Sequence, residues 1–185
     1  MKNKIEYPSV TQILSPWSGY DRIPEHRLEA AAERGTIVHT HCAAYALCQW
    51  SPPPQPEYQS YIDSFKRWFD MFIDETLVCE EELVDHALGY MGHPDLGARS
   101  KKLGGNLLID LKTPVQLHRK IWGSQLAAYK NLLRVAKGIE VDRIGSLQLS
   151  SLGAPAKYTG FTGNIAEYFK AFYSALICYK FYMED

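Results

Sequence analysis

Two short acidic motifs on either side of a predicted turn carry the residue types that could do chemistry in this chain. Pro94-Asp95 is the first, and Asp110-Leu111-Lys112 is the second, at the end of an apolar run that begins at Leu107. Side chains alternate across a strand, so Asp110 and Lys112 are predicted to share one face. Two acids beside a lysine are the smallest set of side chains that could support metal-assisted hydrolysis of a phosphodiester.

A hairpin is predicted to bring the two motifs together. The glycine-rich stretch Leu103-Gly104-Gly105-Asn106 is typical of a turn between two strands, and it would place Asp95 beside Asp110. Pro94 cannot donate a hydrogen bond to a neighbouring strand. We therefore expect the strand to bend, or to lie at an edge, where Asp95 projects.

A third acid is expected from the run Glu80-Glu81-Glu82, which we place on a strand over residues 77–86. Glu81 would share its strand face with Cys79 and Leu83, whose apolar character predicts that they point inward. Glu81 is therefore the predicted inward acid. A shift of one residue in register would reverse this assignment and turn Glu80 and Glu82 inward.

Three converging carboxylates need a cation. Each pair repels by about 4 kcal/mol at 4 Å with an effective dielectric near 20. Oxygen ligands with open water positions favour Mg²⁺ or Mn²⁺ over zinc, as one or two ions. Lys112 would orient the attacking water and stabilise charge in the transition state.

These motifs, with others in the same order along the chain, resemble the PD-(D/E)XK nucleases, and in particular their RecB-like exonuclease branch. The branch includes small phage and mitochondrial single-strand exonucleases. The similarity spans residues 7 to 135, with the motif core over about 34–130. The segments that carry it are Pro8 to Leu14, Arg34-Gly35-Thr36-Ile37-Val38-His39, Gly89 to Asp95, Asp110-Leu111-Lys112, and Gln125-Leu126-Ala127-Ala128-Tyr129.

The resemblance implies a set of site residues. It implies metal ligation by His39, Glu81, Asp95, Asp110 and the carbonyl of Leu111, and catalysis by Lys112 together with the acids. It also implies substrate contacts from Gln125, Tyr129, Thr113, Arg34 and Trp122. Cys178 is the one cysteine late in the chain. The three-cysteine cluster of the iron–sulfur members is therefore missing, and no such cluster is expected.

Two helical segments are predicted to position part of this set. Residues 24–49 carry a helical pattern that includes His39, and residues 117–137 place Trp122, Gln125 and Tyr129 on one face. Aromatic residues at this spacing usually pack in a core. The glutamine between two amphipathic rings favours a face that borders the site, where a ring could stack on a base. The remaining histidines are assigned structural or surface positions: His26, His41, His86, His93 and His118.

Composition sets limits on the class of protein. A chain of 185 residues with 46% hydrophobic residues fits one globular domain and is too short for a helicase motor. No apolar run approaches the roughly 20 residues that span a bilayer, and the first residues do not form a signal peptide. The four cysteines show no paired spacing. We therefore expect a cytoplasmic protein of a bacterium or a phage-infected cell without disulfides.

The net charge of −1 gives no overall basic footprint for nucleic acid. Positive residues instead gather between Arg99 and Lys137, which favours a local basic groove over tight, nonspecific coating of duplex DNA.

An α/β fold follows from these elements: one domain over 1–185 with a central mixed sheet flanked by helices, as in restriction endonucleases. Helices are expected over 24–49, 57–75, 117–137 and 164–182, with a mainly helical part over 9–75. Strands are expected near 77–86, 88–99, 105–112, 143–150 and 157–161. The segment Ser51 to Pro56 is predicted to be an extended, polyproline-like connector, or alternatively part of the rim of a site.

The predicted function is a Mg²⁺- or Mn²⁺-dependent deoxyribonuclease, with an exonuclease favoured over a site-specific endonuclease. Its partner would be single-stranded DNA or DNA ends, with a recombinase or single-strand-binding protein as a further partner, in recombination, repair or phage genome processing. Two alternatives stay open. One is a structure-selective endonuclease, and the other is a catalytically silent nucleic-acid-binding module on the same fold.

Overall fold

A mixed sheet forms the centre of the protein, whose computed structural model describes residues 7–19, 23–113 and 118–183. Within these residues the sheet has five strands in the order β1 (Glu75–Val78), β4 (Leu96–Ser100), β5 (Gly105–Lys112), β6 (Arg143–Gln148) and β7 (Lys157–Gly160). Strands β5 and β6 run parallel, and the other neighbours are antiparallel. The predicted mixed sheet is confirmed.

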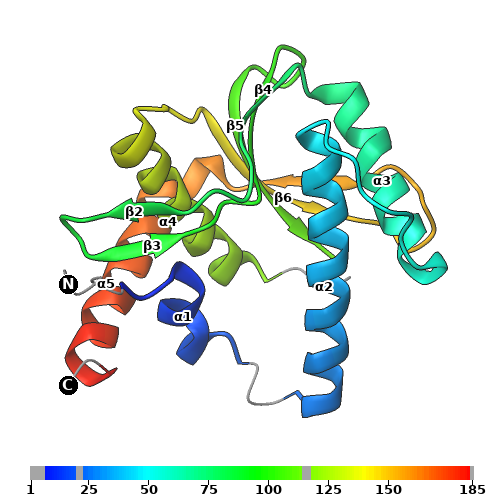
Figure 1. Cartoon of the computed structure of the whole chain (residues 1–185). Helices are drawn as coiled ribbons and strands as arrows, with labels where there is room; N and C mark the ends of the chain where they lie inside the picture. The colour runs from blue at the N-terminus through cyan, green and yellow to red at the C-terminus, as the bar shows by residue number, and fades with distance from the viewer. Residues whose placement is uncertain (1–6, 20–22, 114–117, 184–185) are drawn as a thin grey trace, which may run out of the picture.

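Helices cover both faces of this sheet (Figure 1). Helices α2 (Glu25–Ala46) and α3 (Pro56–Phe72) lie on one side, and α4 (Arg119–Lys137) and α5 (Ile165–Met183) lie on the other. A short helix, α1 (Val10–Leu14), packs against α4 and α5. The short 3-10 turns are η1 (Ser15–Trp17) and η3 (Thr162–Asn164). The predicted α/β domain, with helices flanking the sheet, is therefore the observed architecture.

Strand β5 is buried on both faces, which decides where its polar residues go. Leu108 packs in the core under α4 and α5, whereas Leu107, Ile109 and Leu111 pack in the core under α2 and α3. The alternation predicted for this strand is confirmed. Asp110 lies between two apolar neighbours on a strand with no solvent-facing side, so its carboxylate is held inside the protein.

The parallel pair β5 and β6 needs a crossover connection, and α4 provides it. This helix has a strongly apolar face that packs on the same side of the sheet as Leu108 and Asp110. It ends at Gly138, whose φ of 67° is the left-handed conformation that glycine adopts readily. The crossover therefore lays the α4 face across the end of β5 that carries Asp110 and Lys112.

The two strands predicted over 77–86 and 88–99 are each broken in two. Strand β1 stops at Val78, and the chain forms a separate pair, β2 (Leu83–Asp85) and β3 (Tyr90–Gly92), before β4 begins. Glu80 has a φ of 50°, which is incompatible with a strand, and Pro94 lies in the second gap. The β2–β3 pair packs on α4 (Figure 1). Across the described ranges, no helix is long and apolar enough to cross a membrane.

Candidate metal centre and active site

Asp110 and Lys112 meet at the end of β5, as their shared strand face predicts. Lys112 Nζ lies 2.7 Å from Asp110 Oδ2, and the aspartate exposes only 1% of its surface. The contact is an ion pair by distance, yet neither carboxylate oxygen of Asp110 makes a hydrogen bond of ordinary geometry to a described protein atom. A buried carboxylate in this state retains free lone pairs for a further ligand.

Asp95 lies beside Asp110 because the β4–β5 hairpin forms as predicted. Leu96 pairs with Ile109, which brings the preceding Asp95 next to Asp110. One oxygen of Asp95 accepts a hydrogen bond from the backbone N–H of Leu111 at 2.6 Å. This bond fixes the carboxylate against β5 and leaves its second oxygen, Oδ1, directed towards α2.

His39 approaches these acids from α2. Its Nε2 lies 3.1 Å from the carbonyl oxygen of Leu111, and Nδ1 lies 3.6 Å from Asp95 Oδ1. A hydrogen bond donated from Nε2 to that carbonyl leaves Nδ1 facing the acids, which orients the ring for ligation. The Leu111 carbonyl, predicted as a metal ligand, lies at the site, and in this structure it accepts the histidine N–H.

The inward acid of the glutamate run is Glu80, and the prediction that Glu81 points inward is wrong. Glu80 Oε1 lies 3.7 Å from His39 Nδ1, whereas Glu81 points away and pairs with Lys137 at the surface. The run lies in the turn after β1 rather than on a strand, and Glu80 itself is left-handed. Its backbone N–H donates to the Pro94 carbonyl, which docks this turn against the segment that leads to Asp95.

His39, Glu80 and Asp95 form a group that could hold a metal ion, with one ligand atom from each residue, all within 4.8 Å of one another. Two carboxylates and an imidazole leave several coordination positions for water or substrate oxygens. The unsatisfied oxygens of Asp110 lie next to Asp95 in the same buried end of the sheet. The residues present could therefore hold a metal ion.

The protonation of these groups shows the cost of gathering them without a cation. Burial raises the pKa of Asp110 to about 6, against the attraction of Lys112, and burial also raises the pKa of Asp95. For His39, burial alone would lower the pKa, but the carboxylates of Asp95 and Glu80 outweigh it and raise the pKa to about 9. Without a metal, a proton on His39 provides part of the missing positive charge.

Helix α4 supplies a polar chain that continues from Lys112. Lys112 Nζ lies 3.4 Å from Gln125 Oε1, and Gln125 Nε2 lies 3.4 Å from the Tyr129 hydroxyl. The ammonium also lies 5.4 Å from the ring centre of Trp122. The predicted shared face of these three α4 residues is confirmed, and all three are largely buried. They hold the lysine in place beside Asp110.

Hollows flank His39 on both sides of α2. A cavity of about 490 Å³ is lined by the remaining two predicted substrate-contact residues, Arg34 and Thr113, and by Lys112. Arg34 Nε donates to the Thr113 hydroxyl at 3.3 Å. A larger hollow of about 1170 Å³ is lined by Thr11, His39, Cys79 and Glu80. Both share Ala32, Gly35 and His39 as lining residues, so the two hollows adjoin at His39, and the larger one reaches Glu80.

Some residues near the site were not predicted to take part in it. Arg27 and His118 line the cavity beside Lys112, and His118 had been assigned a structural or surface position. A helical spacing of seven residues from Arg27 to Arg34 was the available signal, because such residues share a face. His93 Nε2 lies 3.8 Å from a carboxylate oxygen of Glu82, and both of these side chains are exposed.

A scan against protein-family models finds no match to this chain, and a search of curated proteins finds no relative at a significant level. The assignment of function therefore depends on the geometry of the site and on the motif resemblance.

Proposed function

We propose that this protein is a metal-dependent deoxyribonuclease of the PD-(D/E)XK type, in the RecB-like exonuclease branch. One observation carries the proposal: Asp95, Asp110 and Lys112 converge at the end of β5, where His39 and Glu80 approach them. The motifs that gave the resemblance come from distant parts of the sequence, and their residues lie together. Chance motifs would have no reason to do so.

Mg²⁺ or Mn²⁺ is the proposed cofactor. Glu80, Asp95 and Asp110 would supply carboxylate oxygens and His39 its Nδ1, which suits a hard or borderline cation with open positions. When bound, such an ion polarises a phosphoryl oxygen and lowers the pKa of a coordinated water. An iron–sulfur cluster is not part of the proposal, because the sequence lacks the late three-cysteine group of the iron–sulfur members.

The chain's own residues have distinct parts in the proposed reaction. Lys112 places a positive charge beside Asp110, where it can orient the attacking water and stabilise the phosphorane-like transition state. Gln125, backed by Tyr129, keeps that ammonium in position. Arg34 and Thr113 lie where they can contact a phosphate of the bound strand. The burial of Asp95 and Asp110 limits access of bulk water to these two acids.

Digestion of end-labelled linear DNA tests this function. We expect purified protein to degrade single-stranded substrates, duplex ends or both with Mg²⁺ or Mn²⁺, and to lose the activity in EDTA. Lys112→Ala and Asp110→Asn should each lower the rate by about 100-fold or more. Lys137→Ala is the matched control, since this lysine pairs with Glu81 at the surface. Full activity of either site variant would refute the proposed site.

Circular single-stranded DNA separates the two kinds of nuclease. An exonuclease leaves it intact, whereas a structure-selective endonuclease linearises it. Protein that binds DNA but cleaves no substrate with either metal would instead support the accessory-module alternative. The intact set of acids and lysine argues against that module, because binding alone gives no reason to bury mutually repelling carboxylates.

We further propose that the protein works in a reducing compartment such as the cytoplasm, with DNA and DNA-processing proteins as partners. The free thiols of Cys42, Cys48, Cys79 and Cys178 support a compartment without disulfide formation.

A further inference from the structure

Trp50 is the most exposed tryptophan among the described residues, with 86% of its surface accessible. Trp68 and Trp122 are each only 3% exposed and pack in the two cores. Trp50 follows the end of α2 and begins the connector to α3. A large indole held in solvent is unfavourable by itself, so its surroundings decide whether it has a use.

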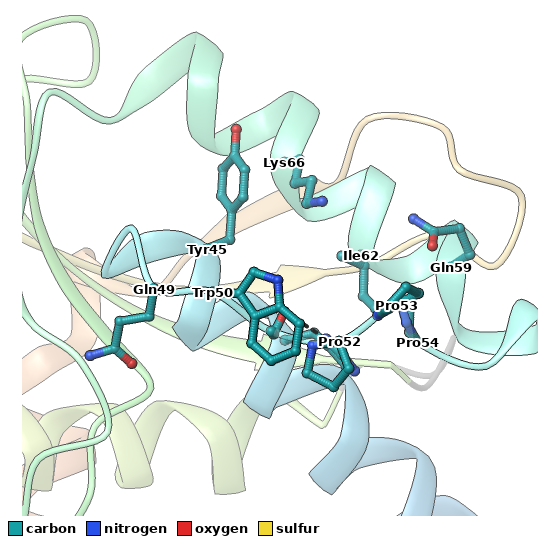
Figure 2. Close-up of a pocket in the computed structure, with 11 residues that line it drawn as sticks. Tyr45, Gln49, Trp50, Pro52, Pro53, Pro54, Gln59, Ile62 and Lys66 are labelled. Carbon is teal, nitrogen blue, oxygen red and sulfur yellow. Dashed lines mark hydrogen bonds between the residues drawn. The ribbon is translucent and has the colours of Figure 1, made fainter.

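Trp50 stands between two hollows. One is a pocket of about 370 Å³ whose walls combine prolines, Tyr45 and Ile62 with polar side chains such as Lys66 and Gln59 (Figure 2). The other is the larger hollow that contains His39 and Glu80. The two hollows share Gln49, Trp50, Ser51 and Pro52 as lining residues. A path of shared lining residues therefore connects the hollow that contains Glu80, past the indole, with the pocket against α3.

The backbone around Trp50 is fixed by three features. Helix α2 ends in a Schellman motif, in which Gln49 N–H donates to the Ala44 carbonyl at 2.8 Å and Cys48 N–H donates to the Tyr45 carbonyl at 3.1 Å. Cys48 takes the left-handed position with a φ of 53°, where most non-glycine residues are strained. The connector then continues as Pro52-Pro53-Pro54, which restricts the chain to extended conformations.

A side-chain contact adds to this support. His41 Nδ1 lies 3.2 Å from the Ser51 hydroxyl, which ties the connector back to α2. The backbone that carries the indole is therefore held in place, and little backbone entropy would be lost when a flat ligand stacks on it.

A positive charge in the pocket that Trp50 also lines indicates the kind of ligand. Lys66 lines the same pocket and lies with Nζ 5.1 Å from the Tyr45 ring centre. A flat aromatic surface next to a positive charge matches one nucleotide, whose base stacks while its phosphate is neutralised. Ala46, the end of α2, lies about two turns beyond His39, which is roughly 10 Å or about three stacked nucleotides.

We propose that Trp50 is a base-stacking platform for single-stranded DNA, and that Lys66 contacts the phosphate of the same strand. This inference rests on the proposed function and names the substrate class of that site. A duplex keeps its bases paired and stacked on one another, so it cannot offer a free base face to the indole along this path. The platform would therefore select a single strand and hold it a few nucleotides from the acids.

Binding measurements without cleavage test the platform. Fluorescence anisotropy of a labelled oligothymidine and of a blunt duplex, both in EDTA, gives the dissociation constants. Trp50→Ala should weaken oligothymidine binding by about 5- to 150-fold, which corresponds to about 1–3 kcal/mol for one stacked base. Trp50→Phe should retain most of the affinity, and Lys66→Ala should reduce the salt dependence of binding. Duplex binding should change little in any of them.

Trp17→Ala is the matched control. Trp17 is also well exposed, at 49%, but lines a different hollow, against α5. The platform is overturned if Trp50→Ala binds oligothymidine as tightly as Trp17→Ala does, if both DNA forms are weakened equally, or if the wild-type protein binds no single strand. The two proposals can also fail separately. If Trp50→Ala loses oligothymidine binding while Trp17→Ala keeps it, and the wild-type protein cleaves no DNA, the platform stands and the nuclease is refuted. If Trp50→Ala instead cleaves DNA and binds oligothymidine as the wild-type protein does, the platform is refuted and the nuclease stands.

Discussion

Asp95 and Leu111 are joined across the β4–β5 hairpin by a hydrogen bond of 2.6 Å from the Leu111 N–H to Asp95 Oδ2. The carbonyl of the same Leu111 lies 3.1 Å from His39 Nε2. One peptide segment of β5 thus orients an acid through its N–H and the histidine through its carbonyl. The relative positions of the candidate ligands are set by backbone, which is less mobile than side chains, so the site is preorganised.

Glu80 and Glu81 provide a sharp test of the candidate metal centre, because they are adjacent and chemically identical. Glu80→Gln should lower Mn²⁺ affinity by at least about tenfold and reduce nuclease activity with it, since it removes a carboxylate from the group. Glu81→Gln should leave both unchanged, since only a surface ion pair with Lys137 is lost. Isothermal titration calorimetry measures the affinity, and the opposite pattern would restore Glu81 as the inward acid.

This pair also shows where prediction from the sequence reached its limit. Alternation along a strand correctly put Asp110 and Lys112 together, because β5 is a regular strand. The same rule failed for the glutamate run, since it assumes extended backbone and Glu80 has a φ of 50°. A left-handed backbone conformation at a residue other than glycine cannot be recognised from the residue type. The turn is stabilised by a contact with the Pro94 carbonyl, which is distant in sequence.

Metal affinity should rise with pH between about 6 and 9. The pKa of Asp110 is raised to about 6 and that of His39 to about 9, so protons occupy candidate ligands at lower pH and must leave when a cation binds. Calorimetry in buffers of different ionisation enthalpy should show proton release on Mn²⁺ binding at pH 7. In His39→Gln the part of this dependence near pH 9 should disappear. A pH-independent affinity would contradict the ligand assignment.

Asp110→Asn should stabilise the metal-free protein while it removes activity. A raised carboxyl pKa means that the stability associated with the protonated group is present below pH 3.8 and is lost as the pH rises through about 6. The charged aspartate then costs about 3 kcal/mol at pH 8. The variant should melt a few degrees higher than wild type at pH 8 and by about half as much at pH 5, by circular dichroism in EDTA. A lower melting temperature at pH 8 would contradict this account.

Gly92→Ala should disturb the position of Lys112 indirectly, through Tyr129 and Gln125. A methyl group at this position would lie 2.5 Å from a ring carbon of the buried Tyr129, which holds Gln125. We expect a loss of about 1–3 kcal/mol in the free energy of unfolding, together with lower activity. Gly35→Ala is the control, because a methyl group there meets nothing within 4 Å and should stabilise α2 by about 0.5–1 kcal/mol. Urea unfolding of both variants measures the difference.

The fold itself was more accessible to prediction than the site. Long periodic segments such as α3 and α4 were identified within a few residues, and the glycine turn before β5 fixed the hairpin. The separation of β2 and β3 from the main sheet was missed, because their pairing depends on packing against α4. Likewise, burial of Trp122 and exposure of Trp50 follow from neighbours that the local sequence does not reveal.

The link between His39 and Leu111 joins residues 72 positions apart in the chain. During synthesis α2 leaves the ribosome well before β5 exists, so the histidine and the acids first meet only after most of the domain has been made. A nascent or partly unfolded chain would hold His39 apart from Glu80, Asp95 and Asp110, which themselves lie on three separate segments. Such a chain would carry every residue of the candidate site without assembling it.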